Sequence, residues 1–87
     1  MVARAAEVGV VSIDKTRGLL VGSDGRSYRE WEPNTWADSG EERPQVVYLG
    51  TGRHGGGIVL RPLFVRTSDG WVNATTGRPA PDHVRLP

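Results

Sequence analysis

Glycine and proline interrupt this chain so often that no long regular element can form without meeting one of them. The 87 residues include 12 glycines and 6 prolines. No stretch of about a dozen residues shows the apolar spacing of an amphipathic helix. The apolar residues instead gather in short runs rich in valine, isoleucine and leucine, which is typical of β-strands. We therefore predict an all-β protein with little helix.

Tight-turn signals mark the first three strands. The runs at Glu7–Ile13 and Leu19–Val21 are separated by a turn that ends at Gly18. The pair Asp24-Gly25 then leads into the alternating segment Ser27–Trp31. Asp-Gly favours the two-residue turn of a β-hairpin because both of its residues tolerate positive φ. The three runs predict an antiparallel meander.

Further apolar runs fill the second half of the chain, at Gln45–Leu49, Gly57–Thr67, Trp71–Ala74 and His83–Leu86. Pro62 cannot donate a hydrogen bond to a neighbouring strand, so it marks an edge or splits its run into two strands. Asp69-Gly70 predicts another hairpin. Roughly five to seven short strands predict one domain over residues 1–87, a small β-barrel or sandwich of SH3-like or OB-like type.

A domain of this size has one small core. Closing the sheet on itself removes exposed strand edges, which the chain has little other means to cover, and this favours a barrel. We expect the apolar interior to come mostly from these positions of the predicted strands: Val10, Ile13, Leu20, Val47, Leu49, Val59, Leu63, Val65 and Trp71.

The segment 31–44 breaks the β pattern. Pro33 and Pro44 bracket it, and the stretch Glu30–Glu42 is rich in acidic residues and has no basic one. We predict a long acidic loop, and loops of this length in small domains usually carry function. Trp36, at its centre, is a large apolar side chain among charges, which is typical of an anchor for a binding partner. The alternative is that Trp36 folds back to cap the barrel.

A glycine-rich loop at 50–57 contains Gly50, Gly52 and Gly55 in the spacing of a dinucleotide-binding fingerprint. That fingerprint binds pyrophosphate at the N-terminus of a helix that follows the glycines. The residues that follow here are β-branched and include a proline, so we predict a connection between two strands and no nucleotide site. Arg53 and His54, at the tip of this loop, are candidate contacts for a partner.

Composition argues against several other classes of function. The chain has no cysteine and only two histidines, neither of them in a metal-ligand spacing, so we predict no metal site and no cofactor. No catalytic arrangement of serine, histidine or carboxylate is recognisable, so we predict a non-enzyme without a small-molecule substrate. No apolar stretch is long enough for a signal peptide or a membrane span. We expect a cytoplasmic or virion-associated protein without membrane contact.

The opening segment Val8–Tyr28 begins with glycine and valine, continues through a basic turn that ends in glycine, and reaches an Asp-Gly turn. The residues that carry this pattern are Gly9, Val10, Lys15, Gly18, Asp24 and Gly25. The pattern resembles the first hairpins of a cold-shock domain, a small OB-like barrel. Members of that family stack nucleic-acid bases on aromatic side chains of their first two strands, whereas aliphatic residues and Ser12 occupy that region here. The resemblance supports a small barrel and not base stacking.

Two functions remain. A net charge of +1, a small core and the segment around Trp36 favour a non-catalytic protein-interaction or structural module. We expect its partner to be another protein or further copies of itself, in a larger assembly such as a virion. The alternative is a nucleic-acid-binding barrel that contacts phosphates through arginines. Its candidate contacts are Arg53, Arg61, Arg66, Arg78 and Arg85.

Overall fold

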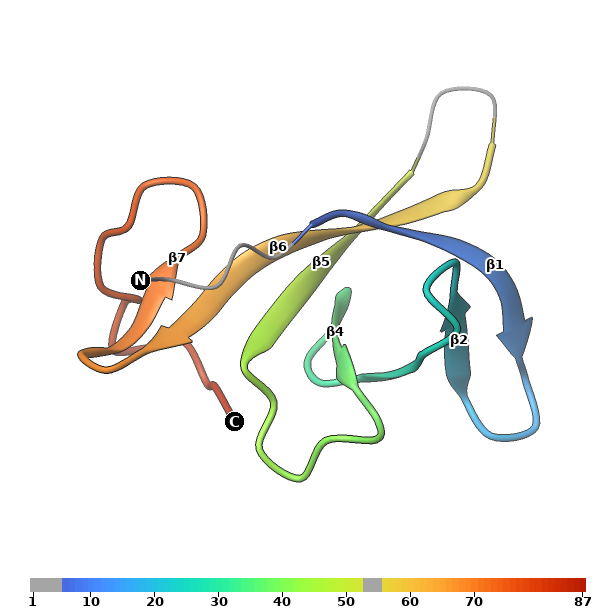
Figure 1. Ribbon diagram of the computed structural model, residues 1–87, viewed down its shortest axis with the longest axis horizontal. Coiled ribbons are helices and arrows are strands. Elements are labelled where there is room, and N and C mark those ends of the chain that lie inside the picture. Colours follow the sequence, from blue (N-terminus) through green and yellow to red (C-terminus); the bar gives the residue numbers. More distant parts are fainter. Residues whose placement is uncertain (1–5, 53–55) are drawn as a thin grey trace.

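The computed structural model describes residues 6–52 and 56–87, which form seven strands and no helix (Figure 1). The strands are β1 (Val8–Asp14), β2 (Leu19–Gly22), β3 (Ser27–Glu30), β4 (Thr35–Asp38), β5 (Val46–Gly52), β6 (Ile58–Thr67) and β7 (Gly70–Asn73). Each strand pairs antiparallel with the next, and β1 also pairs with β6. Strands β1–β6 thus form a closed barrel, with β7 added to β6, and the predicted small all-β barrel is confirmed. The described residues include no helix long and apolar enough to cross a membrane.

The strand order is that of a meander. From β1 to β6, every strand lies beside its neighbour in sequence, and the pairing of β1 with β6 completes the ring. An OB-fold instead closes through a Greek-key arrangement. The likeness of Val8–Tyr28 to a cold-shock domain is therefore confined to its local hairpins.

Both Asp-Gly pairs form the predicted hairpin turns. Gly25 lies between β2 and β3 with φ of 82°, and Gly70 follows the turn between β6 and β7 with φ of 105°. These angles strain any residue with a Cβ atom, which explains glycine at both sites. Asp24 adds a side-chain contact, because its Oδ1 accepts a hydrogen bond from the backbone N–H of Arg26 over 3.0 Å.

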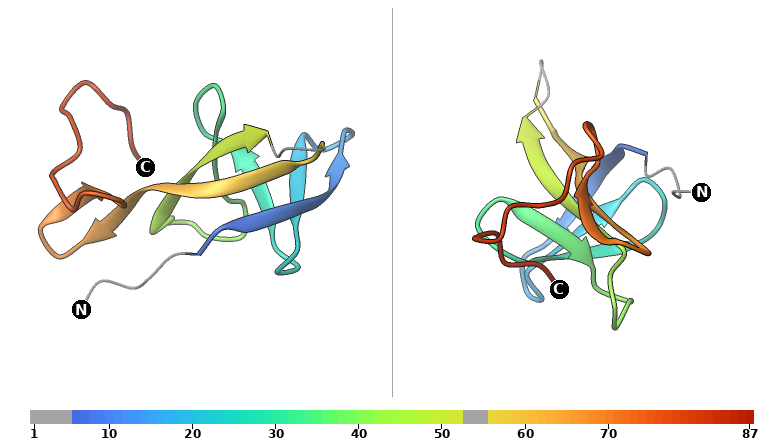
Figure 2. Two further views of the ribbon diagram at one scale, coloured as in Figure 1. Left: turned by 90° about the horizontal axis from the view of Figure 1, so that it is seen from above. Right: turned by 90° about the vertical axis from the view of Figure 1, so that its left-hand side faces the viewer.

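The longest strand, β6, organises the barrel by sharing its two edges among three neighbours (Figure 2). One edge pairs with β5 from Ile58 to Val65. The other edge pairs first with β1, at Val59 and Leu60, and then with β7, from Phe64 onward. Pro62 lies between these two partners, where the missing N–H removes no bond to either of them. Of the two expectations for Pro62, the split of the run into two strands is wrong, because β6 is continuous. The other expectation, a strand edge, is confirmed, because Pro62 lies where this edge of β6 has left β1 and has not yet reached β7.

The glycine-rich loop connects two antiparallel strands, as predicted. β5 ends at Gly52, β6 begins at Ile58, and these two residues pair directly. A strand therefore follows the glycines where a dinucleotide site needs a helix.

The predicted long acidic loop at 31–44 is wrong, because it contains strand β4. Pro33 and Asn34 form a tight turn after β3, in which Asn34 has φ of 65°. The backbone N–H of Trp31 donates to the Thr35 carbonyl oxygen over 2.8 Å and starts the new hairpin. Trp36 lies on β4, opposite Tyr48 of β5, and is partly buried against the core. Trp36 therefore packs as a residue of a barrel strand, and its expected role as an anchor for a partner stays a prediction.

The core lies inside the barrel. Its buried apolar residues are Val8, Leu20, Tyr28, Ala37, Val47, Val59, Leu60, Phe64 and Val65. Four of these were expected, and the expected Val10, Leu49, Leu63 and Trp71 are partly buried. The expectation that Ile13 belongs to the core is wrong. Ile13 pairs with buried Leu20, but its own side chain is 52% exposed. β6 pairs with β1 only at Val8 and Gly9, so no described strand covers Ile13.

The last predicted strand, at His83–Leu86, is also wrong. Only a single bridge, between Val72 and Pro79, extends the sheet after β7. The segment that follows runs back toward the barrel without pairing as a strand (Figures 1 and 2).

The structure predicts a sharp contrast between two aliphatic truncations. Leu60→Ala should lower the free energy of unfolding by about 2–5 kcal/mol, because it opens a cavity at a fully buried position. Ile13→Ala should change it far less, because Ile13 is largely solvated already. Urea unfolding of both variants measures the difference, and equal losses would contradict the placement of the core.

Candidate functional site

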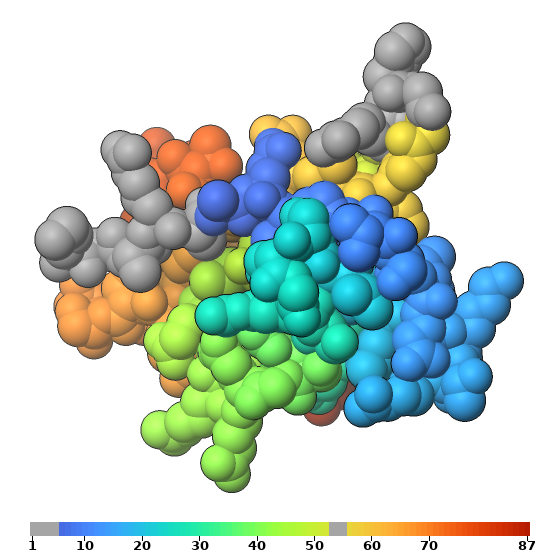
Figure 3. Space-filling view, turned by 45° about the vertical axis from the view of Figure 1, so that its right-hand side comes forward, coloured from blue at the N-terminus to red at the C-terminus, as the bar shows by residue number. Residues whose placement is uncertain are grey.

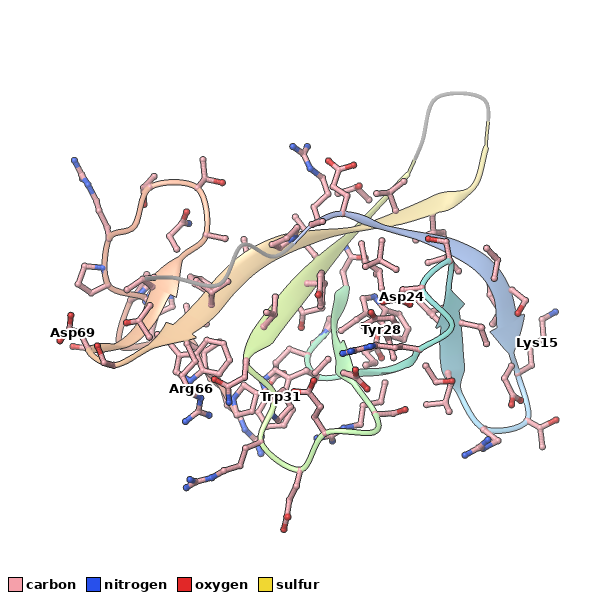
Figure 4. All side chains as sticks on the ribbon, in the orientation of Figure 1. Lys15, Asp24, Tyr28, Trp31, Arg66 and Asp69 are labelled. Carbon is pink, nitrogen blue, oxygen red and sulfur yellow. The ribbon has the colours of Figure 1, made fainter. Side chains whose placement is uncertain are left out.

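A polar network ties the β2–β3 turn to the end of the neighbouring strand β4 and the residues that follow it. The Tyr28 hydroxyl donates a hydrogen bond to Asp24 Oδ2 over 2.6 Å, and the Tyr28 side chain is otherwise buried (Figure 4). Arg26, on the same turn, places its Nη1 3.2 Å from Asp38 Oδ2 and 3.4 Å from Glu41 Oε1. Two acidic residues of the 31–44 segment are thus paired within the fold.

The pKa values in this network move away from neutrality. Burial raises the pKa of Tyr28 far above its ordinary value, and the hydrogen bond to Asp24 raises it further. Desolvation alone raises the pKa of Asp24, but the hydrogen bonds it accepts from Tyr28 and from the Arg26 N–H outweigh this and leave the pKa lowered. General acid–base catalysis needs a pKa close to the working pH, so this network suits a structural role.

Three arginines of the nucleic-acid alternative, Arg61, Arg66 and Arg85, have partners within the described residues. Arg61 Nε lies 3.2 Å from Glu7 Oε1, and Arg85 Nε lies 3.8 Å from Glu32 Oε1. The Arg66 guanidinium lies 4.9 Å from the centre of the Trp71 ring, and its Nη2 donates to the Pro87 carbonyl oxygen. Arg78 is exposed. Arg53 and His54, the predicted contacts of the glycine-rich loop, lie outside the described residues.

One half of β1 presents apolar side chains to solvent. Val11 is 65% exposed and Ile13 is 52% exposed, and they are the two large apolar side chains most open to water in the described chain. Beyond Gly9, β1 pairs with β2 alone, so its other edge has no described strand beside it. Figure 3 shows β1, in blue, on the outer surface of the molecule. We call residues Val11–Asp14 the apolar edge.

A second concave surface lies at the end of the barrel near Trp31. The segment 81–87 passes over it and leaves a cavity of about 510 Å³. The barrel side of this cavity consists of Trp31, Glu32, Thr35, Val47, Leu63 and Phe64. Trp31 and Arg66, both labelled in Figure 4, donate hydrogen bonds to the Arg85 and Pro87 carbonyl oxygens of this segment. We call this surface the tail groove.

A third hollow, of about 820 Å³, lies beside β6 and the 73–77 turn. Leu49, Leu63 and Val72 contribute its apolar part, and the Glu7–Arg61 ion pair lies at its border. No three side chains of metal-ligating type gather here or elsewhere in the residues that the structure describes.

Sequence reasoning did not identify the apolar edge or the tail groove. The run at Glu7–Ile13 indicated a strand. The exposure of Val11 and Ile13, however, depends on β6 beginning at Ile58, so that it pairs with β1 only as far as Gly9. The sequence around Trp31 did not indicate a groove, because Trp31 binds the carbonyl oxygen of Arg85, which is distant in sequence.

Comparison of the chain with protein-family models, with curated proteins and with solved structures finds no match.

Tyr28→Phe tests the polar network. At neutral pH the variant should lose about 1–2 kcal/mol of stability with the hydrogen bond to Asp24. The wild-type protein should also lose stability as the pH rises above about 10, because the unfolded chain ionises this tyrosine while the folded protein holds it neutral. The variant should lose less over that range. Urea midpoints from neutral to alkaline pH measure both effects, and parallel curves would contradict the pKa shift of Tyr28.

Proposed function

We propose that this protein is a non-catalytic protein-interaction module that binds a strand of a partner protein at the apolar edge. The proposal rests on one observation: Val11 and Ile13 are exposed on a strand whose edge is left without a described neighbour. An edge of this kind offers backbone N–H and C=O groups to an added strand, while exposed aliphatic side chains give the contact apolar area.

The chemistry of the neighbouring residues also supports this reading. Lys15 and Arg17 follow the apolar edge in the β1–β2 turn, and both are exposed. Positive charge beside an open edge discourages pairing with an identical edge, because like charges then approach each other. A different protein with an acidic residue next to its strand fits better. An accessory subunit of a larger assembly, such as a virion, has this kind of contact.

Removing the apolar side chains should abolish binding and leave the fold intact. The double substitution Val11→Thr with Ile13→Thr keeps β-branched residues on the strand but replaces a methyl or ethyl group by a hydroxyl. The partner, captured on the immobilised chain and then purified, should bind this variant at least tenfold more weakly in calorimetric titration.

The matched control is the exchange Val11→Ile with Ile13→Val, which preserves the apolar surface and should retain binding. Hydrogen exchange should show protection of the amides of residues 11–14 in the complex. Unchanged affinity in the threonine variant would refute docking at this edge.

The nucleic-acid alternative makes an opposite prediction about salt. Arg61, Arg66 and Arg85 already have partners within the fold, so we expect no binding to duplex or single-stranded oligonucleotides at about 0.15 M salt. Fluorescence anisotropy with labelled oligonucleotides measures this. Binding that weakens steeply with salt, and that is lost in Arg61→Ala with Arg78→Ala, would favour phosphate recognition over the proposed function.

A further inference from the structure

The segment 81–87 is held against the barrel by side-chain donors. The Trp31 indole Nε1–H donates to the Arg85 carbonyl oxygen over 2.8 Å. The Trp71 Nε1–H and Arg66 Nη2 both donate to the Pro87 carbonyl oxygen, over 3.2 Å and 2.7 Å. Two carbonyl groups of the segment, those of Arg85 and Pro87, are thus bound by the tail groove and the adjacent Trp71.

The side chains of the segment are recognised as well. The Arg85 guanidinium lies 5.5 Å from the centre of the Trp31 ring, whose other contact is Arg29 at 5.7 Å. Arg85 also pairs with Glu32. Cation–π contact with a tryptophan and an ion pair together favour arginine at this position.

Aliphatic residues flank this arginine. Val84 and Leu86 line the cavity of about 510 Å³ from the segment side, opposite Val47 and Phe64 of the barrel. The space is mostly apolar, and the segment leaves it open, so larger aliphatic or aromatic side chains can enter. The contacts of Val84–Pro87 therefore describe a site for four consecutive residues: an aliphatic residue, an arginine, a second aliphatic residue and a proline.

One donor at this surface has no acceptor. Arg66 Nε is buried and has no hydrogen-bond partner among the described residues. Buried N–H groups of this kind are rare in native proteins because an unmade bond costs free energy. The Nε and Nη2 groups of arginine share one edge of the guanidinium, and that edge fits the two oxygens of a carboxylate. A ligand that carries a carboxylate next to the position of Pro87 would satisfy both donors.

We propose that the tail groove is a peptide-binding site for a short, proline-containing segment of a partner protein, and that segment 81–87 occupies it within the free chain. The partner segment carries an arginine between two aliphatic residues, and an acidic group follows. This inference rests on the proposed interaction function but not on the apolar edge. A partner segment competes with the chain's own segment, because the two make the same hydrogen bonds.

A peptide with the sequence of residues 82–87, labelled at its N-terminus and with a free C-terminal carboxylate as the acidic group, tests the proposal in the full chain. Arg85→Ala with Leu86→Ser weakens the internal segment without touching the barrel side of the groove. The peptide should bind this variant about tenfold more tightly than it binds the wild-type chain. In the wild-type chain the peptide must displace segment 81–87, which is covalently attached and therefore present at high effective concentration. Fluorescence anisotropy gives the two affinities. Equal affinities, or no binding to a folded variant, would overturn the proposal.

Two controls show where the peptide binds. A peptide with the same alanine and serine changes should bind neither protein. Trp31→Phe in the weakened variant keeps an aromatic ring but removes the indole donor, and it should reduce peptide affinity by about fivefold. Unaltered affinity in that protein would place the peptide elsewhere and refute the tail groove.

The indole N–H resonances of Trp31 and Trp71 in the wild-type chain give a second measurement. They should shift at millimolar peptide, and their invariance would also refute it.

Light scattering shows whether the segment in the tail groove comes from the same chain or from a second copy of it. The wild-type chain should remain a monomer at the concentrations used for resonance measurements. A dimer that dissociates on Arg85→Ala with Leu86→Ser would show that a second copy supplies the segment, and would overturn the assignment to a different partner. Peptide binding and the Val11/Ile13 experiment are independent, so failure of one leaves the other result standing.

Discussion

Two residue pairs of the described strands, Val8 with Leu60 and Gly9 with Val59, close the barrel. Val8, Val59 and Leu60 are buried, so the same residues that join the ends of the sheet also belong to the core. The closure has a steric requirement as well. A Cβ atom on Gly22 would come within 2.6 Å of Val8 Cγ1, so β2 has glycine where β1 bends across it. Without this contact the meander would expose two open edges and much of its interior.

The apolar edge and the tail groove both depend on the small number of residue pairs that join β1 to β6. Because β1 and β6 meet at only two pairs, the second half of β1 continues without a neighbour and leaves Val11 and Ile13 in water. On the other strand, β6 continues past Pro62 and pairs with β7, which carries the following chain beyond the barrel and back to Trp31. The apolar edge and the tail groove therefore both depend on how far β1 and β6 run beyond the pairs that join them.

Features set by neighbouring residues could be predicted from sequence, and features set by distant contacts could not. The Asp24-Gly25 and Asp69-Gly70 turns depend on local backbone angles, as does the exclusion of a nucleotide site at 50–57. β4 was missed because its acidic residues suggested a solvated loop, while Arg26 of the β2–β3 turn pairs with Asp38 and Glu41. Pro33-Asn34 was the available hairpin signal. Exposure of Ile13 and docking of 81–87 on Trp31 follow only from the position of β6.

The meander order also has a consequence for how the chain folds. Each of the hairpins from β1 to β7 joins segments that are close in sequence, so they can assemble step by step with small losses of chain entropy. The pairing of Val8 with Leu60 differs, because it joins positions more than half the chain apart. We expect formation of that contact to be the slow, entropy-limited event, and before it occurs β1 and β6 each have one open edge. Newly synthesised chains are most vulnerable to intermolecular pairing in this interval.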